Sequence, residues 1–348
     1  MAHPPAVPLA RLLKSVSRSF YLSLRILPRG PREPVGLAYL FARAADTIAD
    51  TRVLPRADRL LYLEALRDTF LVDAGSDPAR LASALAPHQQ NPAERTLLLT
   101  LPAALAAYRA LPSADRAAVR RVLLAITQGM RMDLTTFPGE EEGQVVALET
   151  RADLDRYTYW VAGAAGEFWT DVHLAHRPAL AGWDGATMRR RGVRFGRGLQ
   201  MTNILRDLPR DLRIGRCYLP REDLAALGLA PTDLLEPRVL PKVRPLLVDL
   251  LRVTLAHYDE GWAYTLAVPR REWRLRLACA WPLLIGLRTL DLLARAEHLL
   301  EPDAVVKVSR GGVYAILARS AARVGSAGAL DAYYRALRAG ARAAAGLD

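Results

Sequence analysis

Residues 36–51 read GLAYLFARAADTIADT, which is the pattern of a buried helix. Apolar side chains cover most of the circumference of such a helix: Leu40, Phe41, Ala44, Ala45 and Ile48. Asp46 and Asp50 are one helical turn apart, and Tyr39 and Arg43 fall on the same stripe. Because an uncompensated charge inside a protein is costly, this polar stripe needs partners. The stretch therefore predicts a buried helix that presents two carboxylates to other charged groups.

Helical spacing of apolar residues continues from this stretch through almost the whole chain, whereas alternating strand patterns are nearly absent. Helices are expected at residues 8–24, 34–52, 56–73, 93–110, 113–135, 150–176, 184–208, 242–267, 272–298, 311–323 and 328–345. The proline and glycine clusters between them are too short for interdomain linkers, and no repeat of about 30 to 45 residues stands out. The sequence predicts one all-α domain over residues 1–348.

The composition narrows the class of protein. Hydrophobic residues make up 51% of the 348 positions, enough for a continuous core, and the formal net charge is +12. This charge indicates an anionic partner: a nucleic acid, an anionic membrane surface or a phosphorylated small molecule. Cys217 and Cys279 lack disulfide or metal-binding spacing, which is typical of a reducing cytoplasm. With no signal-peptide pattern and no apolar run of about 18 residues, we expect a cytoplasmic protein, and peripheral contact with the inner face of the membrane stays open.

A second pair of carboxylates repeats the first design. Gln200, Asn203, Asp207 and Asp211 are spaced by 3, 4 and 4 residues, again along one stripe of a helix. Pro209 lies between the two aspartates, and proline disfavours helical geometry in the residue before it. We therefore expect this helix to bend or end near residue 208.

The two stripes together predict a site for cations and phosphate. A single Asp-x-x-x-Asp is ordinarily a solvated helix face, but two such pairs on largely apolar helices repel unless cations lie between them. Oxygen ligands of this kind suit Mg²⁺, which is usually held by one or two carboxylates and by substrate phosphates. Arg43, Arg206 and Arg216 are the candidates to receive the remaining phosphate oxygens of a diphosphate.

Five stretches in order resemble the head-to-head prenyl synthases, the family of squalene and phytoene synthases. They are SRSFYLSLRILP (17–28), YLFARAADTIAD (39–50), GMRMDL (129–134), DRYTYWVAGAAG (155–166) and LQMTNILRDLPRDLRIGRCYLP (199–220). The resemblance covers nearly the whole chain. It implies the single-domain, all-α isoprenoid synthase fold with a central active-site cavity.

The resemblance also implies the reaction. Two prenyl diphosphates bind with Mg²⁺, or with Mn²⁺ as an alternative. One diphosphate then ionises, and the double bond of the second molecule attacks the allylic cation to give a cyclopropyl diphosphate. Squalene synthases ionise this product again and reduce it with hydride from NADPH, whereas phytoene synthases lose a proton.

Roles carry over from the motifs to matching positions in this chain. The implied metal ligands are the four aspartates Asp46, Asp50, Asp207 and Asp211. The implied diphosphate contacts are Arg18, Arg43, Arg206 and Arg216. Tyr157 matches the tyrosine that assists ionisation or stabilises charge, and the other implied lining residues are Phe20, Tyr39, Gln200 and Asn203. Gly163 and Gly166, inside an expected helix, indicate that a substrate chain passes close to the backbone.

The end of the chain separates the branches of the family. LACAWPLLIGL (277–287) and AVVKVSRGG (304–312) resemble the squalene synthase pattern, in which the basic segment binds NADPH. The resemblance therefore assigns Lys307 and Arg310 to NADPH and predicts a squalene synthase acting on farnesyl diphosphate. A phytoene or dehydrosqualene synthase, which condenses without reduction, is the alternative.

Other classes of function and partner fit the sequence less well. A catalytically inactive assembly protein of the same fold is the non-enzyme alternative, and the intact aspartate pairs argue against it. A nucleic-acid partner is not expected, because the arginines cluster around acidic pairs instead of forming a separate basic face. The amphipathic segment DAYYRALRAGARAA (331–344) is either plain surface or a contact with anionic lipid.

Replacing a metal ligand tests the aspartate pairs. Asp46→Ala or Asp207→Ala is expected to abolish turnover of farnesyl diphosphate, because each removes a carboxylate that would hold a cation. The fold should persist, as measured by circular dichroism. Normal activity in either variant would show that the proposed site is wrong.

Overall fold

The computed structural model describes residues 24–71, 77–137 and 143–347. Arg18 and Phe20, the opening motif around them and most of the expected helix at 8–24 lie outside the described residues. Packing divides the chain into two compact units: unit 1 is Met1–Leu134 with Phe168–Ala181, and unit 2 is Thr135–Glu167 with Gly182–Asp348. Each unit is described by itself.

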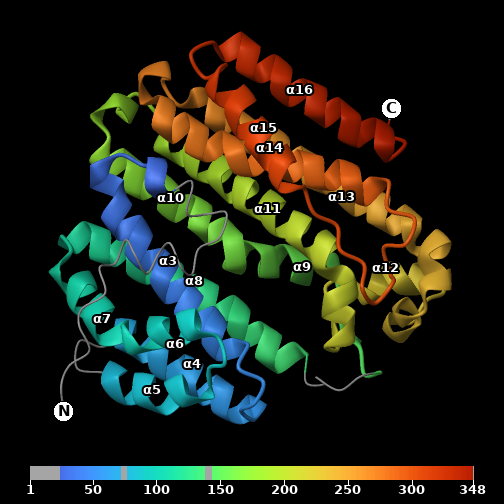
Figure 1. Cartoon of the computed structure of the whole chain (residues 1–348), viewed down its shortest axis with the longest axis horizontal. Helices are drawn as coiled ribbons and strands as arrows, with labels where there is room; N and C mark the ends of the chain where they lie inside the picture. Colours follow the sequence, from blue (N-terminus) through green and yellow to red (C-terminus); the bar gives the residue numbers. More distant parts are fainter. Residues whose placement is uncertain (1–23, 72–76, 138–142, 348) are drawn as a thin grey trace. The chain divides into compact units, whose positions relative to one another are not determined.

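Unit 1 consists of helices (Figure 1). Its longer helices are α3 (Arg29–Ala49), α4 (Arg56–Leu71), α5 (Pro78–Leu85), α6 (Pro92–Leu99), α7 (Leu101–Ala110), α8 (Ser113–Thr136) and the later part of α10 (Ala164–His176). The single turns η1 (Ala86–His88) and η3 (Pro178–Leu180) join them. Phe41, Phe70 and Tyr108 bring α3, α4 and α7 together in edge-to-face contacts, with ring centroids 5.0 to 6.1 Å apart.

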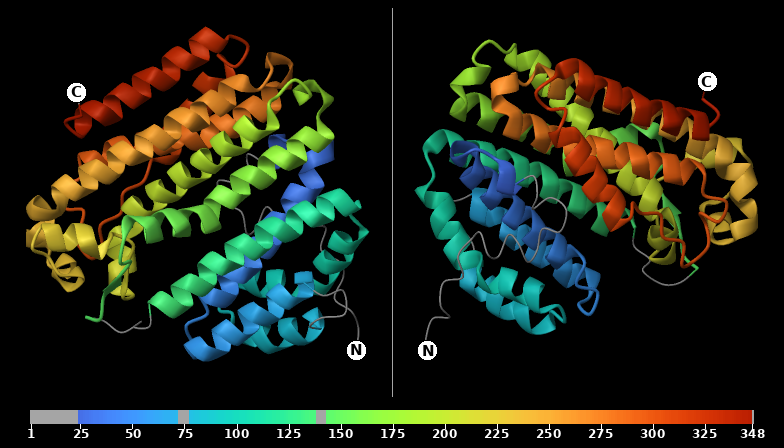
Figure 2. Two further views of the ribbon diagram at one scale, coloured as in Figure 1. Left: turned by 180° about the vertical axis from the view of Figure 1, so that it is seen from behind. Right: turned by 45° about the horizontal axis from the view of Figure 1, so that its top comes forward.

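Unit 2 is built around α11 (Gly185–Arg213) and α13 (Leu240–Ala267), which lie side by side in all three views (Figures 1 and 2). They run antiparallel, because Trp183, just before α11, donates to the Ala267 carbonyl at 3.1 Å, while Thr202 contacts Tyr258 at 2.8 Å. The other elements are α9 (Arg151–Thr158), η2 (Tyr159–Gly163), the start of α10, α12 (Arg221–Ala226), η4 (Pro231–Leu235), η5 (Pro237–Val239), η6 (Arg270–Glu272), α14 (Trp273–Ala294), α15 (Arg310–Ala321) and α16 (Ala327–Ala344). A short parallel pair, β1 (Val146–Ala147) and β2 (Arg216–Cys217), is the extent of sheet in the described chain.

The all-α prediction is confirmed, and the differences lie at prolines. The expected helix at 93–110 is two helices, because Pro102 at the start of α7 cannot donate the hydrogen bond that would continue α6. The expected end near residue 208 is wrong, since α11 continues through Pro209 to Arg213. Leu208, Pro209 and Leu212 are all buried there, and their packing offsets the missing backbone donor.

The expected role of Gly163 and Gly166 is also corrected. A Cβ at Gly166 would overlap the carbonyl oxygen of Gly192 in α11, and a Cβ at Gly196 would overlap that of Ala162. At Gly163, a Cβ would lie 3.1 to 3.2 Å from side chains of Tyr159 and Val193. These glycines serve a helix crossing at backbone distance, instead of the passage of a substrate chain.

The C-terminal helix α16 turns its apolar face into unit 2. The Tyr334 ring stacks on Trp262 of α13, with centroids 4.2 Å apart and planes 5° apart. Trp262 donates to Asp331 at 2.9 Å, and Arg338 forms two hydrogen bonds of 2.6 Å with Asp259. The amphipathic pattern of this helix is therefore explained by packing against the protein.

One helix of the described chain, Arg270–Ala294, is long and apolar enough to cross a membrane. Its most apolar window is 67% buried inside the protein. Gly286 shows how closely it packs, since a Cβ there would overlap the Tyr258 hydroxyl of α13. The run of apolar residues in α14 thus belongs to the core of unit 2.

The helix crossing generates a stability prediction. Gly196→Ala is expected to lower the free energy of unfolding by about 1–3 kcal/mol, because the new methyl group forces α11 away from the backbone at Ala162. Gly340→Ala in α16 is the matched control: nothing lies within 4 Å of its Cβ, and it should raise stability by roughly 0.5–1 kcal/mol. Urea denaturation measures both, and an unchanged midpoint for Gly196→Ala would contradict the crossing.

Candidate functional site

The polar stripe of α3 is where this helix reaches solvent. Tyr39, Arg43 and Asp46 are half-buried and Asp50 is exposed. Most of the apolar positions between them are almost completely buried: Leu40, Phe41, Ala44, Ala45 and Ile48. The helix has the architecture that its sequence predicts: a core helix with one polar edge. The structure thus brings these four side chains onto one face of unit 1.

An arginine is bound to the first aspartate of this stripe. Arg43 donates to Asp46 and also to Glu94 of α6, at 2.7 Å in the second case. Desolvation in the surrounding protein and the neighbouring Asp50 carboxylate raise the pKa of Asp46 to about 6, while Arg43 acts in the opposite direction. The carboxylate pair on α3 is therefore under like-charge stress, which a bound cation would relieve.

The stripe of α11 in unit 2 has the same form. Gln200, Asn203, Asp207 and Asp211 are all half-buried, and most of the positions between them are buried. The Asn203 side-chain amide donates to Gln200 at 3.4 Å. The residues that the sequence places on one stripe do lie on one face of the helix.

Arg206 is bound to the second pair as Arg43 is to the first. Its guanidinium forms two hydrogen bonds with the Asp207 carboxylate, at 2.8 and 2.6 Å. These bonds raise the pKa of Arg206 against the effect of its burial, so the group stays charged. A fixed cation and a carboxylate pair side by side form a polar edge suited to a metal–phosphate ligand.

Tyr157 of α9 lies in an aromatic cluster that the sequence alone did not reveal. Its ring stacks on Tyr218 with centroids 4.7 Å apart, and the two hydroxyls are 3.1 Å apart. Phe137 meets Tyr218 edge to face at 5.2 Å. All three rings are buried. Stacked rings with polar hydroxyls at one edge offer a dry electron-rich surface of the kind that stabilises a carbocation.

Tyr218 follows the strand β2, which also carries Arg216. Arg216 is a buried residue, and its partner across the parallel pair is Val146. Residues two apart in an extended chain point to the same side, so Arg216 and Tyr218 share a side. Recognising GRCYLP (215–220) as extended would have indicated Tyr218, but a strand of two residues carries almost no sequence pattern.

The two residues assigned to NADPH are both exposed to solvent. Lys307 is exposed in an irregular segment, and Arg310 is the exposed first residue of α15. The Ser309 hydroxyl caps this helix by accepting from the Gly312 amide at 3.1 Å. The NADPH assignment of Lys307 and Arg310 stays a prediction.

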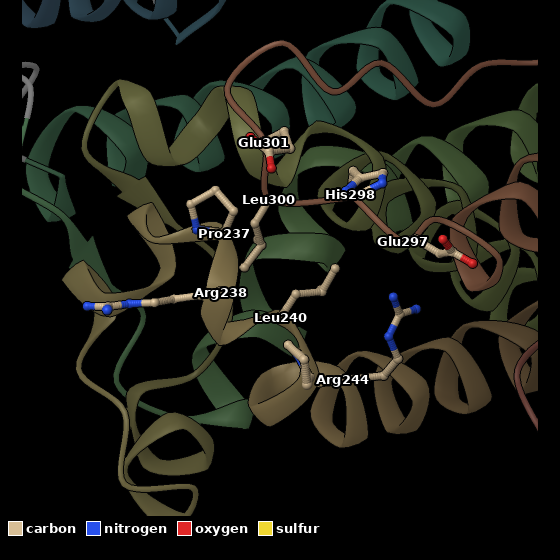
Figure 3. A pocket seen from close by; sticks show the side chains of 9 residues that line it. Pro237, Arg238, Leu240, Arg244, Glu297, His298, Leu300 and Glu301 are labelled. Atoms are coloured by element: carbon tan, nitrogen blue, oxygen red, sulfur yellow. The ribbon is translucent and has the colours of Figure 1, made fainter.

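A surface pocket of about 630 Å³ in unit 2 contains none of the residues assigned above (Figure 3). Figure 3 shows Leu240 and Leu300 in its middle, with charged side chains around them. Arg244 is occupied there as a helix cap, donating to the carbonyls of Ala294 and Ala296 at 3.2 and 2.6 Å. The pocket is therefore not part of the aspartate site.

The donor chemistry fits a hard divalent cation. Within the described residues, no group of three or more His, Cys, Asp or Glu side chains is gathered closely enough to hold a metal by itself. Each stripe instead supplies two carboxylates, the number that Mg²⁺ commonly takes from a protein when phosphate oxygens complete its coordination. The residues present fit Mg²⁺ bound together with a diphosphate.

Known proteins define the class to which this fold and these stripes belong. The profile of the squalene/phytoene synthase family matches residues 13–311, and the chain belongs to that family of prenyltransferases, which condense prenyl diphosphates head to head. Presqualene diphosphate synthase of Rhodopseudomonas palustris is 31% identical over 324 residues, which are 90% of this chain and 97% of that protein. Squalene synthase of Schizosaccharomyces pombe is 25% identical over 89% of this chain and 64% of its own. A solved dehydrosqualene synthase shares the fold with a TM-score of 0.62, 23% identity and coverage of 94% and 95% of the two chains.

The paired tyrosines generate a prediction about stability that does not depend on turnover. Tyr157→Phe and Tyr218→Phe should each lower the free energy of unfolding by about 1 kcal/mol, because each removes one partner of the buried hydroxyl contact. The double variant should lose less unfolding free energy than the two single variants lose together, by roughly 0.5–1.5 kcal/mol. Urea denaturation of the four proteins gives this coupling, with exposed Tyr314→Phe as the neutral control. Strictly additive losses would show that the two hydroxyls are not coupled.

Proposed function

We propose that this protein condenses two molecules of farnesyl diphosphate into presqualene diphosphate. The observation that carries the proposal is the pair of polar stripes on α3 and α11, each with two aspartates one turn apart and an arginine bound to the first of them. The likeness to a presqualene diphosphate synthase over nearly the full length of both chains supports this product.

The reaction is balanced without a reductant. The C1–O bond of one farnesyl diphosphate breaks and inorganic diphosphate leaves. The double bond of the second molecule attacks the allylic carbon, and the cyclopropane ring closes with loss of one proton. The chain must therefore bind two diphosphates, neutralise the one that leaves, and shield a carbocation from water.

Each stripe supplies its own pair of proposed metal ligands. Asp46 and Asp50 of α3, and Asp207 and Asp211 of α11, are the proposed ligands of Mg²⁺, with Mn²⁺ as an alternative. The ion supplies positive charge to the diphosphate as the C–O bond breaks.

The side chains of this chain have separate tasks in the proposal. Arg43 and Arg206 add charge-assisted hydrogen bonds to diphosphate oxygens beside the metal ligands. Tyr157 and Tyr218 present a buried aromatic surface to the cation and hold the charge away from water. Gln200 and Asn203 orient the substrate from the same stripe as Asp207 and Asp211. Arg216 and Tyr39 complete the substrate contacts.

Reduction of presqualene diphosphate to squalene is the second candidate. The likeness to a squalene synthase over 89% of this chain favours it, as does the basic segment with Lys307 and Arg310. The reduction requires hydride from NADPH, whereas the condensation does not. Omitting NADPH from the assay therefore distinguishes the two reactions.

Product analysis tests both candidates in one experiment. The protein is incubated with farnesyl diphosphate and Mg²⁺, with and without NADPH, and the products are identified by mass spectrometry. Presqualene diphosphate in both arms is the expected result. Squalene in the NADPH arm would establish the reductase activity, and dehydrosqualene in both arms would assign the proton-losing branch.

Controls address the metal and the chain length. Chelation with EDTA should stop turnover, and Mg²⁺ or Mn²⁺ should restore it. Geranylgeranyl diphosphate as the only accepted substrate would move the protein to phytoene synthesis. If no prenyl diphosphate is turned over while calorimetry shows diphosphate binding, the proposal fails in favour of the non-catalytic alternative.

A further inference from the structure

We propose that one corner of unit 2 is a docking face for an anionic phospholipid membrane. The corner consists of four side chains in the turn η6 and the first residues of α14: Arg270, Arg271, Trp273 and Arg274. It is called the arginine–tryptophan corner below. It lies outside every residue assigned to the condensation, so its test is independent of turnover.

All four side chains of the arginine–tryptophan corner are exposed. Trp273 keeps 44% of its surface in solvent, whereas most of the other apolar residues of α14 are buried. The Arg274 guanidinium lies over the Trp273 ring, 5.2 Å from its centroid. An apolar ring with a cation on its face can enter the headgroup region, where the cation meets phosphate and the ring meets the acyl boundary.

The positive charge of the corner is uncompensated. None of its three arginines forms an ion pair in the part of the chain that the structure describes. The one acidic residue inside the turn, Glu272, is only 6% exposed and does not join this surface. By contrast, Arg335 and Arg338 of α16 are bound to Asp331 and Asp259 at 2.6 Å. The three arginines of the corner are therefore free of ion pairs in the described chain, whereas Arg335 and Arg338 of the amphipathic C-terminal helix are neutralised.

A second basic segment lies at the same end of the unit. The hydrogen bond from Trp183 to the Ala267 carbonyl places the start of α11 beside the end of α13. Two residues, Val268 and Pro269, separate this end from η6. Figures 1 and 2 show these two turns together, one in green and the other in orange. Arg190, in the second turn of α11, is exposed there. It donates to the Thr187 hydroxyl at 2.7 Å and lies near the exposed carboxylate of Asp184, so the net positive charge at this end comes from the corner itself.

The backbone under the corner is held by a buried arginine. Arg276 donates to the carbonyls of Val268 and Leu266, at 2.9 and 3.1 Å. The residue itself is almost completely buried. These bonds fix the chain just before η6, so the arginine–tryptophan corner is formed in advance and needs little ordering when it binds.

The chemistry favours a lipid surface over a nucleic acid. Guanidinium groups bind phosphates of either partner, but a single exposed tryptophan with one face already covered by Arg274 leaves no row of rings on which successive bases could stack. An anionic membrane offers phosphates to the three arginines and an apolar layer to Trp273 at the same time. Membrane docking also suits a protein whose proposed substrates and product carry long apolar chains.

Vesicle co-sedimentation tests the docking. The full chain is mixed with vesicles of phosphatidylcholine alone or with a third of phosphatidylglycerol, without substrate or metal. Binding is expected for the anionic vesicles only and should weaken as salt rises. R270E/R271E/R274E should partition about 100-fold more weakly, because three cationic contacts are lost. Vesicles with brominated acyl chains should quench tryptophan fluorescence of the wild type, and less so that of Trp273→Phe.

A matched triple variant separates the corner from the overall charge. R80E/R120E/R238E changes the net charge by the same amount at three other exposed arginines and should keep the binding. Thermal melts of both variants confirm that they fold. An equal loss of binding in both triple variants, no loss in either, or no binding of the wild type overturns the proposal. So does tighter binding of a DNA duplex than of vesicles through the same three arginines.

Discussion

In unit 2, the segment formed by η2 and the start of α10 crosses α11 at backbone distance at Gly166 and Gly196, and the placement of the functional side chains in this unit depends on that crossing. The carbonyls of Gly192 and Ala162 occupy the space where Gly166 and Gly196 would carry a Cβ. On the other side of α11, the Tyr258 ring lies against Gly198, and its hydroxyl lies where a Cβ at Gly286 would be. Helix α11 is thus closely packed on two sides, against the backbone near Gly166 on one side and against the Tyr258 ring on the other. Its polar stripe is what remains free for chemistry.

Both stripes combine a pair of carboxylates with an arginine that is bound to the first of them. On α3, Arg43 is shared between Asp46 and Glu94, so one guanidinium faces more than one carboxylate. On α11, Arg206 is committed to Asp207. On each stripe a pair of carboxylates therefore lies beside a guanidinium group. A ligand that brings a metal ion and a phosphate group together satisfies both members at once, which neither a bare cation nor a bare anion would do.

The sequence predicts helices well in this chain because their packing is periodic. The expected helix at 113–135 and the observed α8 differ by one residue, and both polar stripes lie on the faces that their spacing indicates. What sequence reasoning missed depends on contacts between distant segments. The role of Tyr218 follows from its stacking on Tyr157, and the role of Gly166 follows from its contact with the backbone of Gly192. The helix end expected near residue 208 was wrong because the burial of Leu208 and Leu212, which local propensity does not include, carries α11 through Pro209.

The turn η2 marks a constraint on how this segment can change during evolution. Residues Tyr159–Gly163 form a π-helical turn between Tyr157 and Gly166. Such a turn holds about one residue more than the α-helical geometry around it. Removing that residue would rotate the two ends of the segment against each other by roughly 100°. Either the Tyr157 ring would lose its stacking on Tyr218, or Gly166 would lose its close contact with α11. The segment from Tyr157 to Gly166 can tolerate substitutions between these two residues, but it cannot tolerate an insertion or a deletion. Its length is therefore constrained more strictly than its sequence.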